Sequence, residues 1–123
     1  MNRKQFKDFS GRIGQELGQA LEDKTEKFLD DHKIKWTRPT EAFAYILRDG
    51  SVHHFHPDFW LTDLKTFLEC KRTRNTDHAQ DRKFRAVRRK GYQVIPVYND
   101  DTESILLRRI NAAAFLAKPP EGA

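Results

Sequence analysis

Apolar residues at helical spacing predict a long first helix. They recur every three or four positions, which is the period of one helix face, at Ile13, Leu17, Leu21, Phe28 and Leu29, with Ala20 and Thr25 between them. We therefore expect a helix over residues 14–32. Residues 1–11 carry Arg and Lys side chains around two phenylalanines and are expected to form a basic N-terminal arm or the first turn of a helix.

The middle of the chain has the apolar runs and turn residues of β-strands. We expect strands over residues 41–48, 51–61 and 66–71, with a short extended piece at 34–38. Asp49-Gly50 lies between the first two strands and is a strong hairpin-turn signal. The three strands are expected to form a meander.

The second half of the chain returns to helical spacing on both sides of one more strand. A helix is expected over residues 77–90, ended by Gly91. Its expected inward side chains are Ala79, Phe84, Ala86 and Val87. A strand follows at 92–98, where Pro96 favours an edge position or a local bulge. A last amphipathic helix covers residues 105–117.

The predicted order is α-β-β-β-α-β-α in a single domain of 123 residues, with residues 118–123 as a frayed tail. The crossover helix before the last strand allows that strand to join the sheet in parallel. We therefore expect an α/β fold in which helices flank a mixed sheet.

Composition narrows the class of partner. A formal net charge of +5 favours an anionic partner such as nucleic acid. The single cysteine excludes an internal disulfide and fits a reducing compartment. No apolar run approaches the roughly 18 residues of a membrane span, and the N-terminus lacks the apolar segment of a signal peptide. We expect a cytoplasmic protein that binds nucleic acid and no membrane.

Two carboxylates and a lysine occupy positions that strand pairing brings together. Side chains two apart in a strand share a face, so Glu69 and Lys71 project together, whereas Cys70 projects oppositely and is expected to be a small core residue. Pairing of the second and third strands brings Asp58 beside Glu69. Carboxylates of this kind hold Mg²⁺ together with water and substrate phosphate, which indicates a metal-dependent nuclease. In the competing interpretation, Asp58 caps a turn and Glu69 pairs with Lys71 on a solvated face.

The sequence Pro57-Asp58 followed by Glu69-Cys70-Lys71 resembles the motif of the PD-(D/E)XK nuclease superfamily. A closer likeness is to the phage endonuclease I family of Holliday-junction resolvases, over about residues 21–83, roughly half of the chain. The other stretches that carry it are Leu21-Glu22-Asp23-Lys24, Phe28-Leu29, Lys33-Ile34-Lys35-Trp36 and Asp81-Arg82-Lys83. Lys33 and Arg72 stand where that family usually has glycine, and the segment through which these resolvases exchange strands has no counterpart here.

The resemblance implies a restriction-endonuclease-like core and a metal-dependent site. The catalytic set that it implies is Glu22, Asp58, Glu69 and Lys71. Mg²⁺, replaceable by Mn²⁺, would be held by Asp58, Glu69 and the backbone carbonyl of Cys70. Glu22 would bind a second metal or act through water. Glu26 lies one turn later on the same helix face and is its rival, and residue spacing does not decide between them.

A dense basic segment follows the carboxylates. The residues expected to contact DNA phosphates are Arg72, Arg74, Arg82, Lys83, Arg85, Arg88, Arg89 and Lys90. Such contacts carry no base sequence information, which favours a structure-selective or nonspecific nuclease. His53, His54 and His56 come without the cysteine cluster or HExxH pattern of a zinc site, so we expect polar residues on a half-exposed strand.

The resemblance implies a Mg²⁺-dependent endonuclease that acts on branched DNA in a bacterial or phage-infected cell. A resolvase cuts two symmetric strands, so a homodimer is expected with it. Two alternatives stay open: a nicking, mismatch-repair-type or transposon-type endonuclease on duplex DNA, and a non-catalytic DNA-binding module of the same fold. The intact set of Asp58, Glu69 and Lys71 argues against the binding module, which needs none of them.

Overall fold

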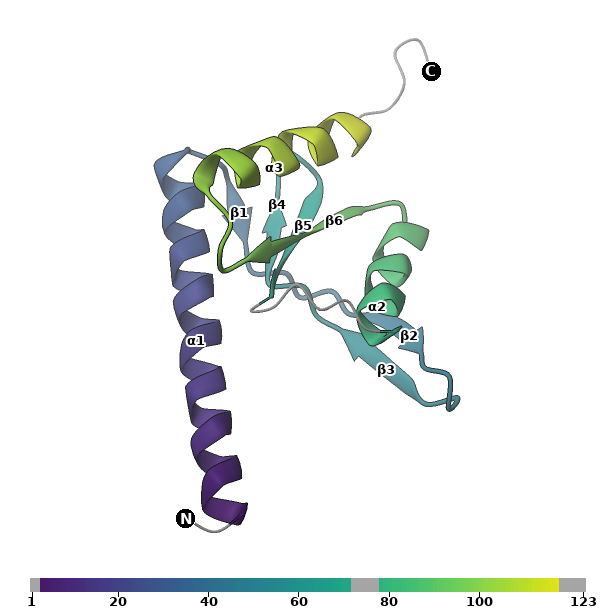
Figure 1. The fold of residues 1–123 in the computed structure, drawn as a ribbon. Helices are drawn as coiled ribbons and strands as arrows, with labels where there is room; N and C mark the ends of the chain where they lie inside the picture. The colour runs from purple at the N-terminus through teal and green to yellow at the C-terminus, as the bar shows by residue number, and fades with distance from the viewer. Residues whose placement is uncertain (1–2, 72–77, 118–123) are drawn as a thin grey trace.

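The computed structural model describes the backbone of residues 3–71 and 78–117 and the side chains of residues 16–71 and 78–116. Its elements, labelled in Figure 1, are α1 (Arg3–Asp31), β1 (Trp36–Thr37), β2 (Phe43–Ile46), β3 (Val52–Phe55), β4 (Phe59–Leu61), β5 (Thr66–Lys71), α2 (His78–Arg89), β6 (Gln93–Tyr98) and α3 (Glu103–Ala117).

Four strands form the central sheet, in the order β1-β4-β5-β6. β4 pairs antiparallel with both β1 and β5, whereas β5 and β6 run parallel. α2 lies in the crossover connection that a parallel pair requires, and β2 and β3 form a separate hairpin. The expected mixed α/β fold is therefore confirmed, and β6 takes the edge position that Pro96 favours.

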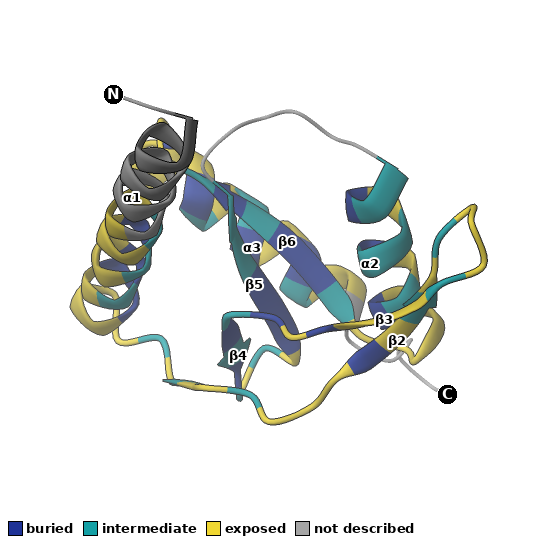
Figure 2. Ribbon diagram, turned by 90° about the horizontal axis from the view of Figure 1, so that it is seen from below, coloured by how far each residue is buried: buried dark blue, intermediate teal, exposed yellow. Residues whose placement is uncertain are grey.

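Helices cover both faces of the central sheet, so two apolar cores flank it. On one face α1 and α3 pack on the strands, and the buried residues are Leu21, Phe28, Leu29, Phe59, Leu61, Leu68, Ile95, Val97, Leu106, Ile110 and Ala113. On the other face α2 and the hairpin enclose Phe43, Phe55, Phe67, Phe84, Val87 and Val94. Figure 2 shows the buried strands between these two layers.

The single strand expected over residues 51–61 is wrong, because residues 56–58 are not in a strand and separate β3 from β4. β3 belongs to the hairpin and β4 to the central sheet. Pro57 explains the break, since proline has no N–H for a sheet ladder and restricts the residue before it. The extended piece at 34–38 contributes β1 as a further strand, so the order is α-β-β-β-β-β-α-β-α instead of α-β-β-β-α-β-α.

α1 is longer than the sequence indicates. It begins at Arg3, so of the two alternatives for residues 1–11 the arm is wrong and the helical start is correct wherever the backbone is described. Straight-chain Arg, Lys and Gln residues favour a helix there. Leu17, expected in the buried stripe, is 50% exposed, whereas Leu21 is 2% exposed. The first half of α1 extends past the sheet (Figure 1), which leaves Leu17 uncovered.

Expected turn residues end the elements around the hairpin and α2. Gly50 and Gly91 have positive φ angles of 84° and 90°, a conformation that glycine adopts without strain. Asp49 Oδ1 accepts a hydrogen bond from Ser51 N at 2.9 Å in the hairpin turn. Gly91 N donates to Arg88 O at 2.9 Å where α2 ends.

The inward face of α2 differs in part from the expected one. Its buried residues are Gln80, Phe84 and Val87. Ala79 and Ala86, also expected inward, are half-buried. The tail expected over residues 118–123 lies outside the described residues. Among the helices described, none has the length and apolarity needed to cross a membrane.

Lys33 follows α1 in a left-handed backbone conformation, with φ at 55°. Ile34 N donates to Leu29 O at 2.9 Å, and Lys33 N donates to Asp30 O at 3.1 Å. These bonds close the helix in the manner of a glycine C-cap. Because a side chain makes the left-handed conformation cost roughly 1–2 kcal/mol, Lys33 stores strain that glycine would not.

We expect Lys33→Gly to raise the free energy of unfolding by about 0.5–1 kcal/mol, because relief of the strained φ outweighs the greater backbone entropy of glycine. Lys35→Gly removes the same side chain from an exposed residue without positive φ, and is expected to lower that free energy. Urea denaturation measures both effects. A Lys33→Gly protein no more stable than Lys35→Gly would contradict the left-handed cap.

Candidate active site

The strand register places Asp58 across from Glu69. β4 pairs Phe59 with Leu68, so one step before β4 sets Asp58 opposite Glu69. Asp58 N donates to Leu68 O at 3.1 Å, and Cys70 N donates to Asp58 Oδ2 at 2.7 Å. The Asp58 carboxylate thus accepts a backbone hydrogen bond at the edge of β5 that faces β4. Asp58 and Glu69 are neighbours, as the sequence predicts.

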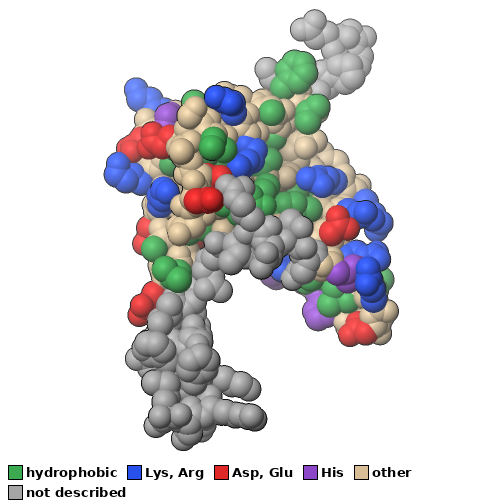
Figure 3. Space-filling view, viewed as in Figure 1, with side chains coloured by type: hydrophobic (Ala, Val, Ile, Leu, Met, Phe, Trp, Pro, Cys, Tyr) green, Lys and Arg blue, Asp and Glu red, His purple; other side chains and the backbone are tan. Residues whose placement is uncertain are grey.

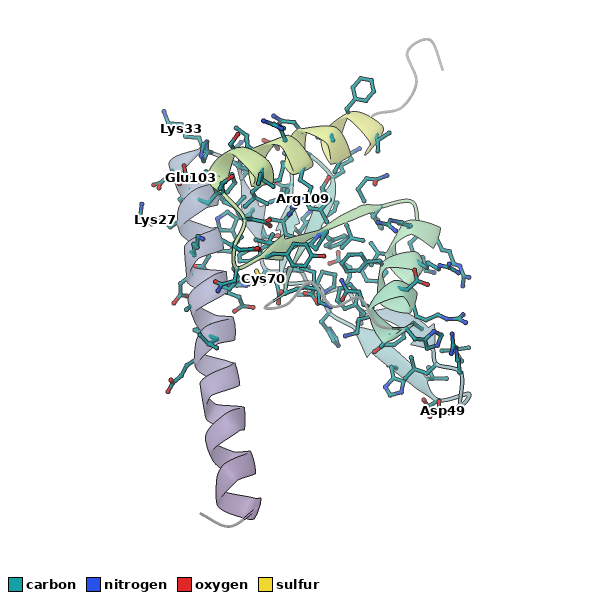
Figure 4. All side chains as sticks on the ribbon, in the orientation of Figure 1. Lys27, Lys33, Asp49, Cys70, Glu103 and Arg109 are labelled. Atoms are coloured by element: carbon teal, nitrogen blue, oxygen red, sulfur yellow. The ribbon has the colours of Figure 1, made fainter. Side chains whose placement is uncertain are left out.

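Alternation along β5 divides its side chains between the two faces of the sheet. Leu68 packs in the core under α1 and α3, and Phe67 packs in the core under α2. Cys70 therefore points toward α1 and Glu69 toward α2. Cys70 Sγ lies 3.5 Å from Thr25 Oγ1 of α1. Figure 4 shows Cys70 beside α1. Burial raises the pKa of the Cys70 thiol to about 12, so the thiol is a neutral packing group.

The carboxyl group of Glu69 is held in an environment that opposes its charge. Its pKa is raised to about 9, first by burial and then by a hydrogen bond to Asp58 and by the negative charge of Asp58. The positive charges of Lys83 and Lys71 act in the other direction without offsetting burial. Glu69 is therefore protonated at neutral pH unless a further cation lies beside it.

Glu22 approaches Asp58 from α1. Burial raises the pKa of Glu22, and a hydrogen bond to Asp58 and the charge of Asp58 raise it further, against the opposing effect of Arg38. Glu26, its rival on the helix, has Oε1 paired with Arg38 Nη2. Asp58, just before β4, therefore lies between Glu22 of α1 and Glu69 of β5 and is hydrogen-bonded to each.

Arg38 belongs to this site although the sequence does not indicate it. Its Nη1 donates to Asp58 O at 3.1 Å, and lies 3.9 Å from Glu22 Oε1. Its position in space depends on the pairing of β1 with β4. Because β1 has only two residues, it is too short to show the alternation of apolar and polar residues that would predict this pairing.

Asp58 and Glu69, at the paired ends of β4 and β5, are the residues that could hold a hard divalent cation. Asp58 and Glu69 supply carboxylates, the ligand type that Mg²⁺ prefers. The N–H and C=O of one residue in a strand point to the same side, so the Cys70 carbonyl faces the side on which Cys70 N bonds Asp58. In the part of the chain that the structure describes, no three His, Cys, Asp or Glu side chains form a ready metal-ligand group. The candidate ligands are instead two carboxylates, of Asp58 and Glu69, and one backbone carbonyl, of Cys70.

α2 carries most of the basic residues expected to contact DNA. Those exposed on it or just after it are Arg85, Arg88, Arg89 and Lys90, and Arg82 is half-buried. Figure 3 shows Lys and Arg side chains gathered over α2 and the hairpin. Lys83 is also half-buried, and it differs from the others because its charge acts on Glu69. Arg72 and Arg74 lie outside the described residues.

The hairpin histidines are exposed polar residues. His53 stacks on Tyr45 with ring centroids 5.5 Å apart, and its Nε2 lies 2.8 Å from Ser51 Oγ. His54 and His56 are exposed. These positions place the histidines on the same side of the molecule as α2, which packs on β2.

Comparison with known proteins identifies no relative. No protein-family model, curated protein or solved structure matches the chain. The resemblance to PD-(D/E)XK nucleases therefore stays a prediction, and a function has to be inferred from the chemistry of Asp58, Glu69 and their neighbours.

The raised pKa of Glu69 predicts a specific pH dependence of stability. Below pH 4.5, the ordinary pKa of the group, Glu69 is protonated in both the folded and the unfolded chain. Between that pH and about 9, the unfolded chain loses the proton that the folded chain keeps. The contribution of Glu69 to the free energy of unfolding therefore falls as pH rises through this window.

We expect Glu69→Gln to remove this decline and to exceed the wild type in stability at pH 8 by roughly 1–3 kcal/mol, with the difference vanishing toward pH 4. Urea denaturation between pH 4 and 9 in EDTA measures it. Glu41→Gln is the control, because Glu41 is exposed just before β2 and its replacement should leave the profile unchanged. Parallel profiles for wild type and Glu69→Gln would exclude the buried, protonated carboxyl.

Proposed function

We propose that this protein is a metal-dependent endonuclease that hydrolyses phosphodiester bonds in DNA and prefers branched DNA. The observation that carries the proposal is the convergence of Asp58 and Glu69 at the paired ends of β4 and β5. Carboxyl groups held against each other in a buried place oppose one another's ionisation. A divalent cation is the group that allows both to be charged, which is why the pair supports a metal site.

The sheet holds the proposed ligands in place. When bound, Mg²⁺ or Mn²⁺ supplies a water of lowered pKa and polarises the phosphate. Asp58 and Glu69 would hold the ion through carboxylate oxygens, and Cys70 through its backbone carbonyl. The bond from Cys70 N to Asp58 Oδ2 fixes the Asp58 carboxylate relative to the backbone of β5. Ligands on paired strands keep their geometry better than ligands on loops.

Lys71 acts on the same face as Glu69. The two residues lie two apart on β5, so their side chains project together, and the charge of Lys71 acts on Glu69. From there the ammonium group orients the attacking water and stabilises the negative charge that develops on the phosphoryl oxygens. Lys83 of α2 adds a second positive charge near Glu69.

The basic residues of α2 provide contacts to the DNA backbone. Lys and Arg side chains neutralise phosphates and position a duplex, but they do not read base sequence. Recognition by shape follows, which favours a junction or other branched DNA over a sequence-defined site. Symmetric cutting of a junction requires two active sites, so the proposal includes a homodimer.

We expect Asp58→Asn to slow cleavage of a synthetic four-way junction in Mg²⁺ or Mn²⁺ by about two orders of magnitude or more, because the amide keeps the shape but loses the ligand charge. Asp63→Asn is the matched control: Asp63 begins another Asp-x-Lys sequence, with Lys65, but is exposed in the turn between β4 and β5. Its rate should equal that of the wild type. Gel assays with the junction and its linear duplex, with and without EDTA, measure the rates.

Equal cutting of junction and linear duplex by the wild type would keep the nuclease and remove the preference for branched DNA. Cutting that survives EDTA would rule out the metal site. If the wild type binds the junction tightly but cuts neither substrate, the protein is a DNA-binding module and not an enzyme.

A further inference from the structure

The register of the central sheet brings Arg38 beside Asp58 and the α1 carboxylates Glu22 and Glu26. β1 pairs Trp36 with Leu61 and Thr37 with Trp60. One further step therefore sets Arg38 opposite Phe59, the residue that follows Asp58. Pro39 comes next and disfavours a helical turn at Arg38. The strand end thus delivers the guanidinium to the space between the start of β4 and α1.

The guanidinium of Arg38 is shared among three partners. Nη1 donates to the Asp58 carbonyl at 3.1 Å and lies 3.9 Å from Glu22 Oε1. Nη2 makes an ion pair with Glu26 Oε1. Glu22 and Glu26 are one turn apart on the same face of α1, so one planar fork faces both of them.

Aromatic rings hold Arg38 in this place. Its guanidinium carbon lies 4.4 Å from the centroid of the Phe59 ring and 5.5 Å from that of Trp36. Phe59 is fully buried, so the surface under the guanidinium is fixed. A guanidinium stacked on a ring and bonded at its edge loses little further freedom when it pairs with carboxylates.

The placement of Arg38 bears on how many metal ions the site holds. Glu26 pairs directly with Arg38, and Glu22 lies between Arg38, 3.9 Å away, and Asp58, to which it is hydrogen-bonded. A cation bound between Glu22 and Glu26 would have to displace the guanidinium from its ion pair and from the Phe59 ring. Asp58 and Glu69 meet on the other side of Asp58, where Lys71 and Lys83 are the nearby cations.

We propose that Arg38 is the resident cation on the α1 side of the site, and that the protein consequently binds one divalent ion, at Asp58 and Glu69, and no second ion at Glu22 or Glu26. The inference rests on the proposed function, because it takes an ion at Asp58 and Glu69 as given. Arg38 is then a positioning residue, which holds the backbone of Asp58 and keeps the α1 carboxylates occupied.

The test counts Mn²⁺ ions bound to the full chain by isothermal titration calorimetry and by electron paramagnetic resonance of free Mn²⁺. We expect one ion per chain for the wild type and two for Arg38→Gln. Adding Glu22→Gln and Glu26→Gln to Arg38→Gln should return the count to one. Arg38→Lys, which keeps a positive charge, should stay at one.

Arg85→Gln is the matched control. Arg85 also pairs with a carboxylate, with its Nε 3.1 Å from Asp81 Oδ2, but on the outer side of α2. Its replacement removes the same charge and should leave one bound ion. Near-UV circular dichroism of each variant checks that the fold is kept.

Two ions on the wild type would overturn the inference and leave the nuclease intact, and this result does not depend on the folding of any variant. A count of one for both wild type and Arg38→Gln would also overturn it, since Arg38 would exclude nothing. No Mn²⁺ bound to the wild type would instead refute the metal-dependent function itself, and the inference with it.

Discussion

The hydrogen bond from Cys70 N to the Asp58 carboxylate is the interaction on which the rest of the site depends. Pro57 separates the hairpin from β4, because it offers no N–H to a ladder. Asp58 follows it and meets β5 through its backbone N–H at Leu68 and through its carboxylate at Cys70. A side chain bonded in this way is held by the sheet itself, with α1 on one side and Glu69 on the other.

Burial then decides the electrostatics around Asp58. The pKa of Glu69 is raised because its carboxyl is enclosed and adjoins Asp58, and two lysines do not reverse that effect. The cations on the two sides differ in kind. Lys71 and Lys83 bring compact ammonium groups on flexible chains, whereas Arg38 brings a planar fork stacked on the Phe59 ring. Under the proposed function, this asymmetry puts the reacting side at Asp58 and Glu69 toward β5 and the supporting side toward α1.

Local sequence patterns predict the parts of this arrangement that depend on period and on turn residues. Alternation along β5 places Glu69 with Lys71 and Cys70 opposite, and Gly50 and Gly91 mark turns that the backbone adopts. The break at Pro57 is missed because apolar strand-type residues stand on both sides of it, at Phe55 and Phe59. Arg38 is missed because its role depends on β1, whose two residues pair only through tertiary contacts. The exposure of Leu17 likewise depends on how far the sheet extends along α1, and the spacing of apolar residues in the helix does not predict that extent.

The central claim is that Asp58 and Glu69 hold a divalent ion, and the most direct measurement is anomalous X-ray diffraction from crystals soaked in Mn²⁺. The account predicts an anomalous peak within about 2.5 Å of carboxylate oxygens of both Asp58 and Glu69. The Cys70 carbonyl should be a further ligand, and the peak should be lost in Asp58→Asn crystals. An ordered Mn²⁺ at the hairpin histidines alone, or a fully soaked crystal without a peak between Asp58 and Glu69, would contradict it.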